Sequence, residues 1–285
     1  MSRAEGQLQL WRLRIGDCSD ADLRRGLCWL GEDELGDFRA CESPLRRRQF
    51  ALGRLLLRGA LSHLHGERPP SEWRIVAGPH GRPELAPEST KDEPFIGFNL
   101  AHSGDRIVLV TGPLPALGID LEDGRKPRNV EKLARRWFNP PEIAELESLP
   151  AADRPHWFYR CWTIKEAWSK ARGGALAPSL RQITLTRGGA DGAGEVAVSD
   201  AEAGSPLGPL NPRGSSRWRF VLPEVWPGFH CALVCQSGAD IHLASLRMIG
   251  LGQFESIPSV SVRELRSVAP NHLASLRAEI KGRAQ

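Results

Sequence analysis

The order of strand-like and helix-like segments is the feature of this 285-residue sequence that most constrains its fold. A strand-like run comes first, over residues 7–15, and a cap at Ser19–Asp20 predicts a short helix after it. Apolar residues at helical spacing then predict a long helix over 44–64, with Pro44 in its first turn. Strand-like runs follow at 73–76, 95–100, 106–111 and 117–121. This first series already requires a fold that mixes helices with a sheet.

A second series of helices and strands follows the first. The predicted helices cover 129–149, with a break at Asn139–Pro140–Pro141, and 152–173; the predicted strands lie near 182–187, 217–222 and 229–235. The two halves of the chain meet near Pro113–Leu114–Pro115. We therefore expect an N-terminal half over 1–115 and a C-terminal half over 116–236, within which the Gly-, Ala-, Ser- and Pro-rich residues 188–216 form a mobile loop. Residues 237–285 are expected to be a C-terminal extension of unknown role, with an amphipathic helix over 262–282.

Composition excludes several classes of protein. Hydrophobic residues make up 41% and charged residues 25% of the chain, which excludes a collagen, a coiled coil and a wholly disordered chain. The net charge of +4 permits an anionic partner without requiring a nucleic acid. The first ten residues lack the apolar region of a signal peptide, and no run approaches 18 apolar residues. The six cysteines form no CxxC pair, so we expect reduced thiols in a cytoplasmic protein with no membrane contact.

The first segment with candidate chemistry is FNLAHSGD, residues 98–105. It separates two predicted strands, so we expect a loop or tight turn that exposes His102 and Ser103. Taken alone, the segment favours an ordinary hairpin turn with a hydrogen-bonded histidine over a ligand site.

The second segment is GIDLE, residues 118–122. Alternate residues of a strand share a face, so Asp120 and Glu122 point the same way while Ile119 and Leu121 point to the core. Two neighbouring carboxylates repel, and the pKa of one must rise unless a cation lies between them. Mg²⁺ suits carboxylates together with substrate phosphates. A half-exposed strand whose acids face water is an equally good interpretation of this segment alone.

The third segment is WTIKEAWSKARGGAL, residues 162–176. On a helix, Trp162, Glu166 and Lys170 lie on one face. A solvent-exposed Glu–Lys pair is the simplest alternative, but the bulky neighbours predict a deeply buried helix; they are Trp157, Phe158, Tyr159, Trp162 and Trp168. Together the segments predict one Mg²⁺ among Asp120, Glu122 and Glu166, able to stabilise the charge that builds as a P–O bond breaks.

The second and third segments together resemble the signature pair of the 4'-phosphopantetheinyl transferases, G-I/V-D-x-E/D followed by F/W-S/T/C-x-K-E-A/S-x-x-K. Three further stretches are similar to accessory blocks of that family: Gly81–Arg82–Pro83 with Leu85, the FNLAHSGD segment, and RWFNPPEIAEL over 136–146. Their spread is similar to the double-length, Sfp-type group. The resemblance implies an α+β fold made of a pseudo-twofold pair of similar α/β subdomains, with the active site in the cleft between them.

The resemblance also implies a reaction. Family members transfer the 4'-phosphopantetheine arm of coenzyme A to a serine of an apo acyl or peptidyl carrier protein, with Mg²⁺ (or Mn²⁺) as metal and adenosine 3',5'-bisphosphate as by-product. The expected partners are therefore coenzyme A and an acidic carrier protein in a transient complex, with no nucleic acid and no membrane. We expect a monomer.

Residue roles follow from the match to the motifs. Asp120, Glu122 and Glu166 would hold the metal, with Asp120 and Glu166 also catalytic. Glu166 would orient or deprotonate the attacking serine, while Lys170 would both bind the diphosphate of coenzyme A and steady the leaving phosphate.

The N-terminal half would supply the rest of the coenzyme A contacts. His102 would contact a phosphate beside Ser103, and Arg82 would lie near the nucleotide end. For the 3'-phosphate we prefer Arg54 among Arg46, Arg47, Arg48 and Arg54, although a solvated helix face is an equal alternative. Ala101 stands where the family usually has Ser, so a hydroxyl contact to the nucleotide is lost.

Two alternatives from other classes stay open at this point. A Mg²⁺-dependent phosphohydrolase would use the same acids on a nucleotide diphosphate and would act without a carrier protein. A non-catalytic nucleic-acid-binding module would use arginines and the nine tryptophans, but those tryptophans are scattered through helix and strand patterns.

Overall fold

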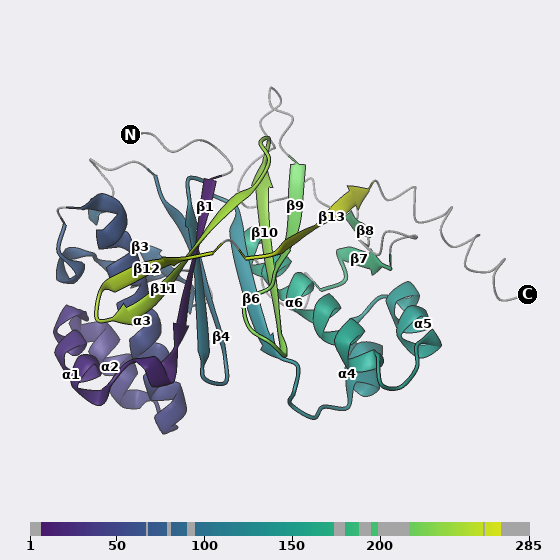
Figure 1. The fold of residues 1–285 in the computed structure, drawn as a ribbon, viewed down its shortest axis with the longest axis horizontal. Coiled ribbons are helices and arrows are strands. Elements are labelled where there is room, and N and C mark those ends of the chain that lie inside the picture. Colours follow the sequence, from purple (N-terminus) through teal and green to yellow (C-terminus); the bar gives the residue numbers. More distant parts are fainter. Residues whose placement is uncertain are drawn as a thin grey trace, which may run out of the picture. The chain divides into compact units, whose positions relative to one another are not determined.

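The computed structural model describes residues 7–66, 68–78, 81–89, 95–173, 180–187, 195–198, 217–258 and 260–268 (Figure 1). The chain divides into two compact units. Unit 1 contains Met1–Pro115 and Ile241–Val260, and unit 2 contains Ala116–Asp240 and Ser261–Gln285. Each unit has its own sheet, helices and hydrophobic core, so the predicted α+β class is confirmed. The predicted cleft between the halves stays a prediction.

The core of unit 1 is a five-stranded sheet in the order β12-β11-β1-β5-β4. Its strands are β1 (Gln7–Arg14), β4 (Gly97–Ser103), β5 (Arg106–Gly112), β11 (His242–Gly250) and β12 (Gln253–Ile257). The central strand β1 is parallel to β11 and antiparallel to β5. Trp11 on β1 is fully buried, and its indole N–H donates to the Thr111 hydroxyl over 2.9 Å. A separate two-stranded sheet pairs β2 (Ile75–Ala77) with β3 (Pro83–Leu85).

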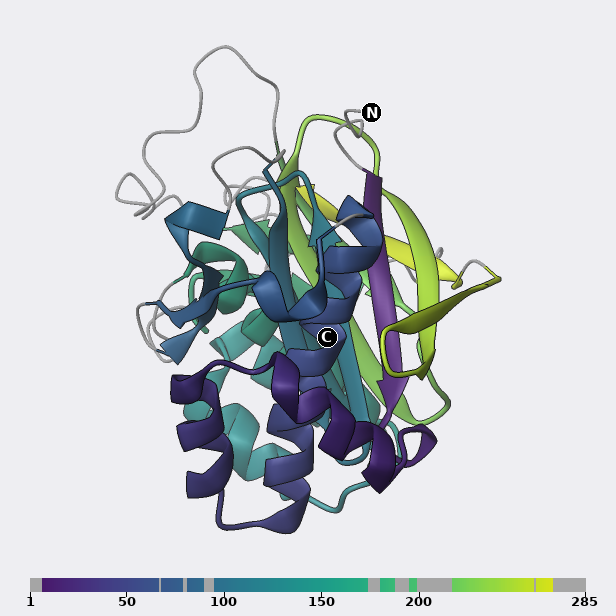
Figure 2. The same cartoon turned by 90° about the vertical axis from the view of Figure 1, so that its left-hand side faces the viewer.

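Helices gather on one face of the unit 1 sheet, as Figure 2 shows. They are α1 (Asp20–Gly26), α2 (Glu32–Ala40) and α3 (Pro44–His65), with 3-10 turns at Ile15–Asp17, Leu27–Trp29, Pro70–Glu72 and Pro87–Ser89. The predicted cap is present: the Ser19 hydroxyl accepts from the Asp22 amide and opens α1. Helix α3 buries Leu52, Leu56 and Ala60 against the core of this unit.

Unit 2 is built on a six-stranded sheet in the order β6-β10-β9-β13-β8-β7. The strands are β6 (Leu117–Asp123), β7 (Ile183–Thr186), β8 (Glu195–Val198), β9 (Arg217–Pro223), β10 (Phe229–Ser237) and β13 (Val262–Val268). The helices are α4 (Val130–Trp137), α5 (Pro140–Ser148) and α6 (Arg154–Arg172). Helix α6 packs on β6 and β10. Its predicted deep burial is confirmed at Trp157, Phe158, Tyr159 and Trp168, whereas Trp162 is only partly buried.

Three predictions about local structure need correction. Most of FNLAHSGD is strand rather than loop, because β4 continues to Ser103 and only Gly104–Asp105 turn the chain, with Gly104 at a φ of 57°. The helix predicted over 262–282 is wrong for 262–268, where β13 pairs with both β9 and β8 and buries Leu265. Of the loop predicted over 188–216, residues 195–198 form β8. The remaining residues of these last two segments, 188–194, 199–216 and 269–282, lie outside the described residues.

Residues 237–268 take part in both units. Strands β11 and β12 complete the sheet of unit 1, and β13 lies inside the sheet of unit 2. The strand pairings of β13 explain the error in the helix prediction: neighbouring strands on both sides fix a backbone whose sequence alone also suits a helix.

Candidate active site

The close approach of α6 to β6 builds the site, and Gly118 permits it. A Cβ atom at this position would lie 2.1 Å from the Ala167 carbonyl oxygen and 2.5 Å from the Ala171 amide nitrogen. Both are backbone atoms of α6, so a side chain at 118 would push the helix away from the strand. The glycine of the GIDLE segment therefore sets the distance between the strand that carries Asp120 and the helix that carries Glu166 and Lys170.

Asp120 and Lys170 form the centre of this arrangement. The Lys170 ammonium donates to Asp120 Oδ1 over 2.7 Å and to the Ile119 carbonyl over 3.1 Å. Asp120 is buried, with 4% of its surface exposed. Fifty residues of sequence separate the two side chains, so the sheet–helix packing alone brings them together.

Glu166 lies beside Asp120 and is strongly perturbed. Burial raises the pKa of Glu166 to about 8, the negative charge of Asp120 adds to this increase, and Lys170 opposes it. Asp120 Oδ2 is itself buried and has no hydrogen-bond partner among the described residues. Two carboxyl groups in this position can share a proton or a cation, but they cannot both stay ionised without one.

Glu122 is held differently from the other two acids. Both of its carboxylate oxygens lie 3.4 Å from guanidinium nitrogens of Arg128, an ion pair that sequence reasoning missed. Its charge also raises the pKa of Glu166, but less than Asp120 does. In the part of the chain that the structure describes, no three His, Cys, Asp or Glu side chains form a group able to hold a metal. The three-carboxylate metal set thus stays a prediction.

The two remaining acids nevertheless suit a hard divalent cation. Mg²⁺ is usually held by one or two carboxylates together with waters and substrate phosphates. The buried Asp120 Oδ2 and the adjacent Glu166 carboxyl provide such oxygen donors. Glu122, the third acid that the sequence predicts as a ligand, pairs with Arg128 in this structure.

Comparison with known proteins shows which family these residues match. Residues 116–221, which carry the site, match the family model of the 4'-phosphopantetheinyl transferase superfamily. The chain is 33% identical over 179 residues to 4'-phosphopantetheinyl transferase HetI of Nostoc sp., a match that covers 63% of this chain and 73% of HetI. The chain belongs to the 4'-phosphopantetheinyl transferase superfamily.

Other members of the superfamily match over different shares of their length. The chain is 36% identical over 130 residues to 4'-phosphopantetheinyl transferase AcpT of Escherichia coli K12, covering 46% of this chain and 60% of AcpT. It is 27% identical over 240 residues to a phosphopantetheinyl transferase of Thraustochytrium sp., covering 80% of this chain and 77% of that protein. The longest of these three matches therefore extends well beyond the residues of the family model.

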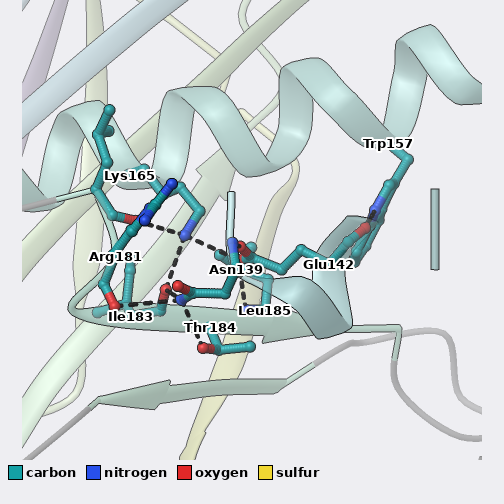
Figure 3. Close-up of polar contacts among 9 residues, drawn as sticks. Asn139, Glu142, Trp157, Lys165, Arg181, Ile183, Thr184 and Leu185 are labelled. Carbon is teal, nitrogen blue, oxygen red and sulfur yellow. Dashed lines mark hydrogen bonds and ion pairs between the residues drawn. The ribbon is translucent and has the colours of Figure 1, made fainter. Parts of the chain in front are cut away.

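Lys165, the residue before Glu166, has a role in this transferase that the sequence did not reveal. It is fully buried, and its ammonium lies 2.9 Å from Glu142 Oε1, 2.6 Å from the Leu180 carbonyl and 2.7 Å from the Ile183 carbonyl (Figure 3). Burial raises the pKa of Glu142, and the charge of Lys165 opposes that increase. The pair thus joins α6 to α5 and β7 at the residue next to Glu166.

Further hydrogen bonds complete this buried network. Glu142 also accepts from the backbone amides of Leu185, over 2.9 Å, and Asn139, over 2.8 Å. The Asn139 side-chain amide donates to the Ile183 carbonyl and to the Thr184 hydroxyl (Figure 3). The Lys165 ammonium and both carboxylate oxygens of Glu142 therefore have hydrogen-bond partners, as a buried charge pair requires. The signal for it was present in the sequence, since Glu142 lies in the accessory block over 136–146.

Unit 1 carries the residues expected to contact coenzyme A. His102 is exposed on β4 and Ser103 is buried at the end of that strand. Arg82 donates to the Phe98 carbonyl over 3.2 Å, and burial lowers the pKa of its guanidinium. This contact places Arg82 against β4, the strand that carries the histidine.

Three of the four arginines proposed for the 3'-phosphate have partners in the structure. The Arg54 Nε lies 3.2 Å from Glu34 Oε1, and Glu34 also pairs with Arg58. Arg47 donates to the Cys41 carbonyl, whereas Arg48 donates to the Cys18 carbonyl and pairs with Asp20. Arg46, near the start of α3, is exposed. The assignment of Arg54 thus stays a prediction, and it would require a phosphate to share that arginine with Glu34.

Within residues 7–268, leaving aside the gaps between the described ranges, none of the helices is both long and apolar enough to cross a bilayer.

Proposed function

We propose that this protein transfers the 4'-phosphopantetheine arm of coenzyme A to a serine hydroxyl of an apo acyl or peptidyl carrier protein. The constellation formed by buried Asp120 with the partly buried Glu166 and Lys170, within the residues that match the superfamily, is the observation that carries the proposal. The serine oxygen forms a bond to the phosphorus that bears the pantetheine arm. The P–O bond to the 5'-phosphate breaks, and adenosine 3',5'-bisphosphate leaves.

Each residue of the constellation has a distinct task in this reaction. Glu166 accepts a hydrogen bond from the serine hydroxyl and orients it, and in its ionised form its carboxylate can take up the serine proton as the new bond forms. Lys170 carries positive charge beside Asp120 and offsets the negative charge on the diphosphate. Asp120 keeps that ammonium in place.

A divalent cation completes the proposed site. Asp120 and Glu166 would hold Mg²⁺ or Mn²⁺, with Glu122 as the third ligand that the sequence predicts. When bound, the cation supplies positive charge against the diphosphate oxygens. Lys170 and Glu166 keep the roles described above, positioning the phosphate and the serine.

The remaining contacts follow the sequence predictions. We assign His102, Ser103 and Arg82 to coenzyme A, and Arg54 to its 3'-phosphate. The partner is an acidic carrier protein in a transient complex, the protein is a monomer, and the site of action is the cytoplasm.

Mass spectrometry of a panel of apo carrier proteins tests the proposal. Incubation with coenzyme A and Mg²⁺ should add one phosphopantetheine arm to a carrier serine, and omission of the metal should stop the reaction. Release of adenosine 3',5'-bisphosphate from coenzyme A without any carrier would instead indicate a phosphohydrolase and contradict the proposal.

Variants of the acids assign the chemistry to the site. Glu166→Ala and Asp120→Ala should each lower the rate of carrier modification by about 10² or more while the protein stays folded. Glu147→Ala, which removes an exposed acid of α5 paired with Arg135, is the matched control and should keep full activity. Retained turnover in either site variant, with an unchanged melting curve, would rule out this assignment.

A further inference from the structure

A cavity in unit 2 lies outside the constellation that performs the proposed reaction. Its volume is about 200 Å³, and α6, β9, β10 and the start of β13 line it. The side chains that give it its chemistry are His156, Arg160, Glu224, Phe229, His230 and Arg263. This volume is below the range of about 300–1,000 Å³ of a typical small-molecule site, so the cavity suits a single small group rather than a nucleotide.

The described side chains that line the cavity give it an excess of positive charge. Arg160 and Arg263 are close enough to repel each other, and burial together with Arg263 lowers the pKa of Arg160. Glu224, at the exposed rim, provides one negative charge against these two positive charges. An anion placed between the guanidinium groups would remove the repulsion.

Two histidines add neutral hydrogen-bonding groups. The rings of His156 and His230 lie 4.9 Å apart between centroids, and Tyr159 stacks on His230 at 5.5 Å. Burial, His156 and Arg160 lower the pKa of His230 to about 4, so its imidazole is uncharged at neutral pH. Phe229 adds an apolar wall. The lining therefore offers guanidinium forks and imidazoles, which together match an oxyanion.

The cavity lies close to the acidic site within the same unit. His230 on β10 is the cross-strand neighbour of Glu122 on β6. Arg160 precedes Glu166 on α6 by six residues, which is about 9 Å of helix rise. A protein whose serine reaches Glu166 would therefore present its neighbouring surface groups to this cavity.

We propose that this cavity binds an oxyanion, a carboxylate or a phosphate group, and that an acidic side chain of the docked carrier protein supplies it. The identity of the partner rests on the proposed function; the binding of an oxyanion does not. A guanidinium pairs with a carboxylate or a phosphate through two parallel hydrogen bonds, so two arginines in a small cavity select a single acidic group.

Steady-state kinetics test the carrier as the source. Arg160→Gln and Arg263→Gln should each raise the KM for an acidic carrier protein about five- to tenfold, while the kcat and the KM for coenzyme A stay the same. Arg135→Gln removes an exposed arginine of α4 that does not line the cavity, and it should leave all three values unchanged. Arg263 is itself exposed, so its variant keeps the test valid if Arg160→Gln does not fold.

A titration with inorganic phosphate tests the site without any carrier. At constant ionic strength, phosphate should shift the imidazole NMR signals of His156 and His230 in the full chain and should shift them much less in Arg263→Gln. If the arginine variants raise the KM for the carrier protein, the oxyanion that fills the cavity belongs to the carrier. If phosphate shifts the histidine signals but the carrier KM values do not change, the cavity binds a free anion, and the carrier is not its source.

Unchanged carrier KM values together with no phosphate response would overturn the inference entirely. Because the titration needs no transfer reaction, it gives a result even if the proposed function fails.

Discussion

At the scale of single residues, the perturbed carboxyl of Glu166 is the most informative group in the protein. Its pKa rises because burial removes water from it and because Asp120 lies beside it, and only Lys170 opposes these effects. A raised pKa of this kind is common where a carboxyl takes part in proton transfer or metal binding.

The raised pKa predicts that the metal-free protein loses stability as pH rises. Between pH about 4.5 and about 8, the folded state keeps a proton on Glu166 that the unfolded chain has released. The free energy of unfolding should therefore fall over this range, by up to about 1.4 kcal/mol per pH unit from this group. Urea denaturation in the presence of a chelator, at several pH values, measures the slope.

Glu166→Gln provides the matching variant, because a glutamine stays neutral at every pH. It should remove this part of the slope, while Glu147→Gln on the exposed face of α5 should keep it. Adding Mg²⁺ at pH 8 should stabilise the wild-type protein more than Glu166→Gln. Equal slopes in Glu166→Gln and the wild type would disprove the assignment.

Residue types and spacing predicted part of the site. The spacing of residues in a strand predicts the face on which Asp120 lies, and the spacing in a helix predicts that Glu166 and Lys170 share a face. The three side chains then come together if the strand and the helix pack against each other. The Glu122–Arg128 pair depends on the course of the chain after β6, and the Arg54–Glu34 pair depends on how α2 packs on α3. Neither can be read from spacing within one element.

At the scale of elements, the packing of α6 on β6 decides whether the site exists. Gly118 in the strand leaves no room for a side chain, and Lys165 in the helix is tied to Glu142 on α5. The first contact sets the distance between the two elements, and the second restrains the helix beside Glu166.

Gly118→Ala should damage both stability and activity. Its Cβ would clash with backbone atoms of α6, which cannot move as a flexible side chain could, so we expect a loss of about 1–3 kcal/mol and a large fall in kcat. Gly36→Ala is the control: nothing lies within 4 Å of a Cβ at that helical position, and alanine should stabilise α2 by up to about 1 kcal/mol. Denaturation curves and transfer rates give both results, and an active, stable Gly118→Ala protein would refute the role of this contact.

The buried ion pair of Lys165 and Glu142 should respond to substitution as a unit. Lys165→Met leaves Glu142 buried without its cation, and we expect a cost of about 3–5 kcal/mol. Combining it with Glu142→Gln should recover part of that loss, because no unpaired charge remains. The exposed pair Arg135–Glu147 serves as the reference, with an expected coupling of about 0–1 kcal/mol in the same double-mutant cycle. Additive effects of Lys165→Met and Glu142→Gln would show that the pair is not coupled.

Sequence periodicity predicted α3, α6 and most strands of both sheets close to their observed bounds. It missed α2, β11 and β12, and it assigned a helix to the residues of β13. Long-range contacts decide the structure of β11 and β13, because β11 pairs with β1 and β13 with β9, each more than thirty residues away in the chain; β12 then pairs with β11. Local pattern carries little information about such pairings.

At the scale of the whole molecule, the chain passes between the two units three times. Residues up to Pro115 belong to unit 1, the chain then builds most of unit 2, returns to unit 1 for β11 and β12, and ends in unit 2. Each unit therefore depends on the last part of the described chain.

Truncation should reveal this dependence. A chain that ends at Ser237 lacks β11, β12 and β13, so β1 loses its parallel partner and β8 and β7 lose their connection to β9. We expect cooperative unfolding to be lost in both units. A chain that ends at Pro258 keeps β11 and β12, and amide exchange should show a protected β1 but faster exchange at the β9 amides that bond to β13 than at those that bond to β10. If the chain that ends at Ser237 had the same unfolding midpoint as the full chain, this expectation would be wrong.

The parallel pairing of β1 with β11 also has a consequence for biosynthesis. Strand β1 leaves the ribosome first, yet its neighbour in the sheet follows more than two hundred residues later. During that interval one edge of β1 has no partner, and exposed strand edges promote association between chains. A nascent molecule of this enzyme therefore exposes that edge to other chains until β11 has been synthesised.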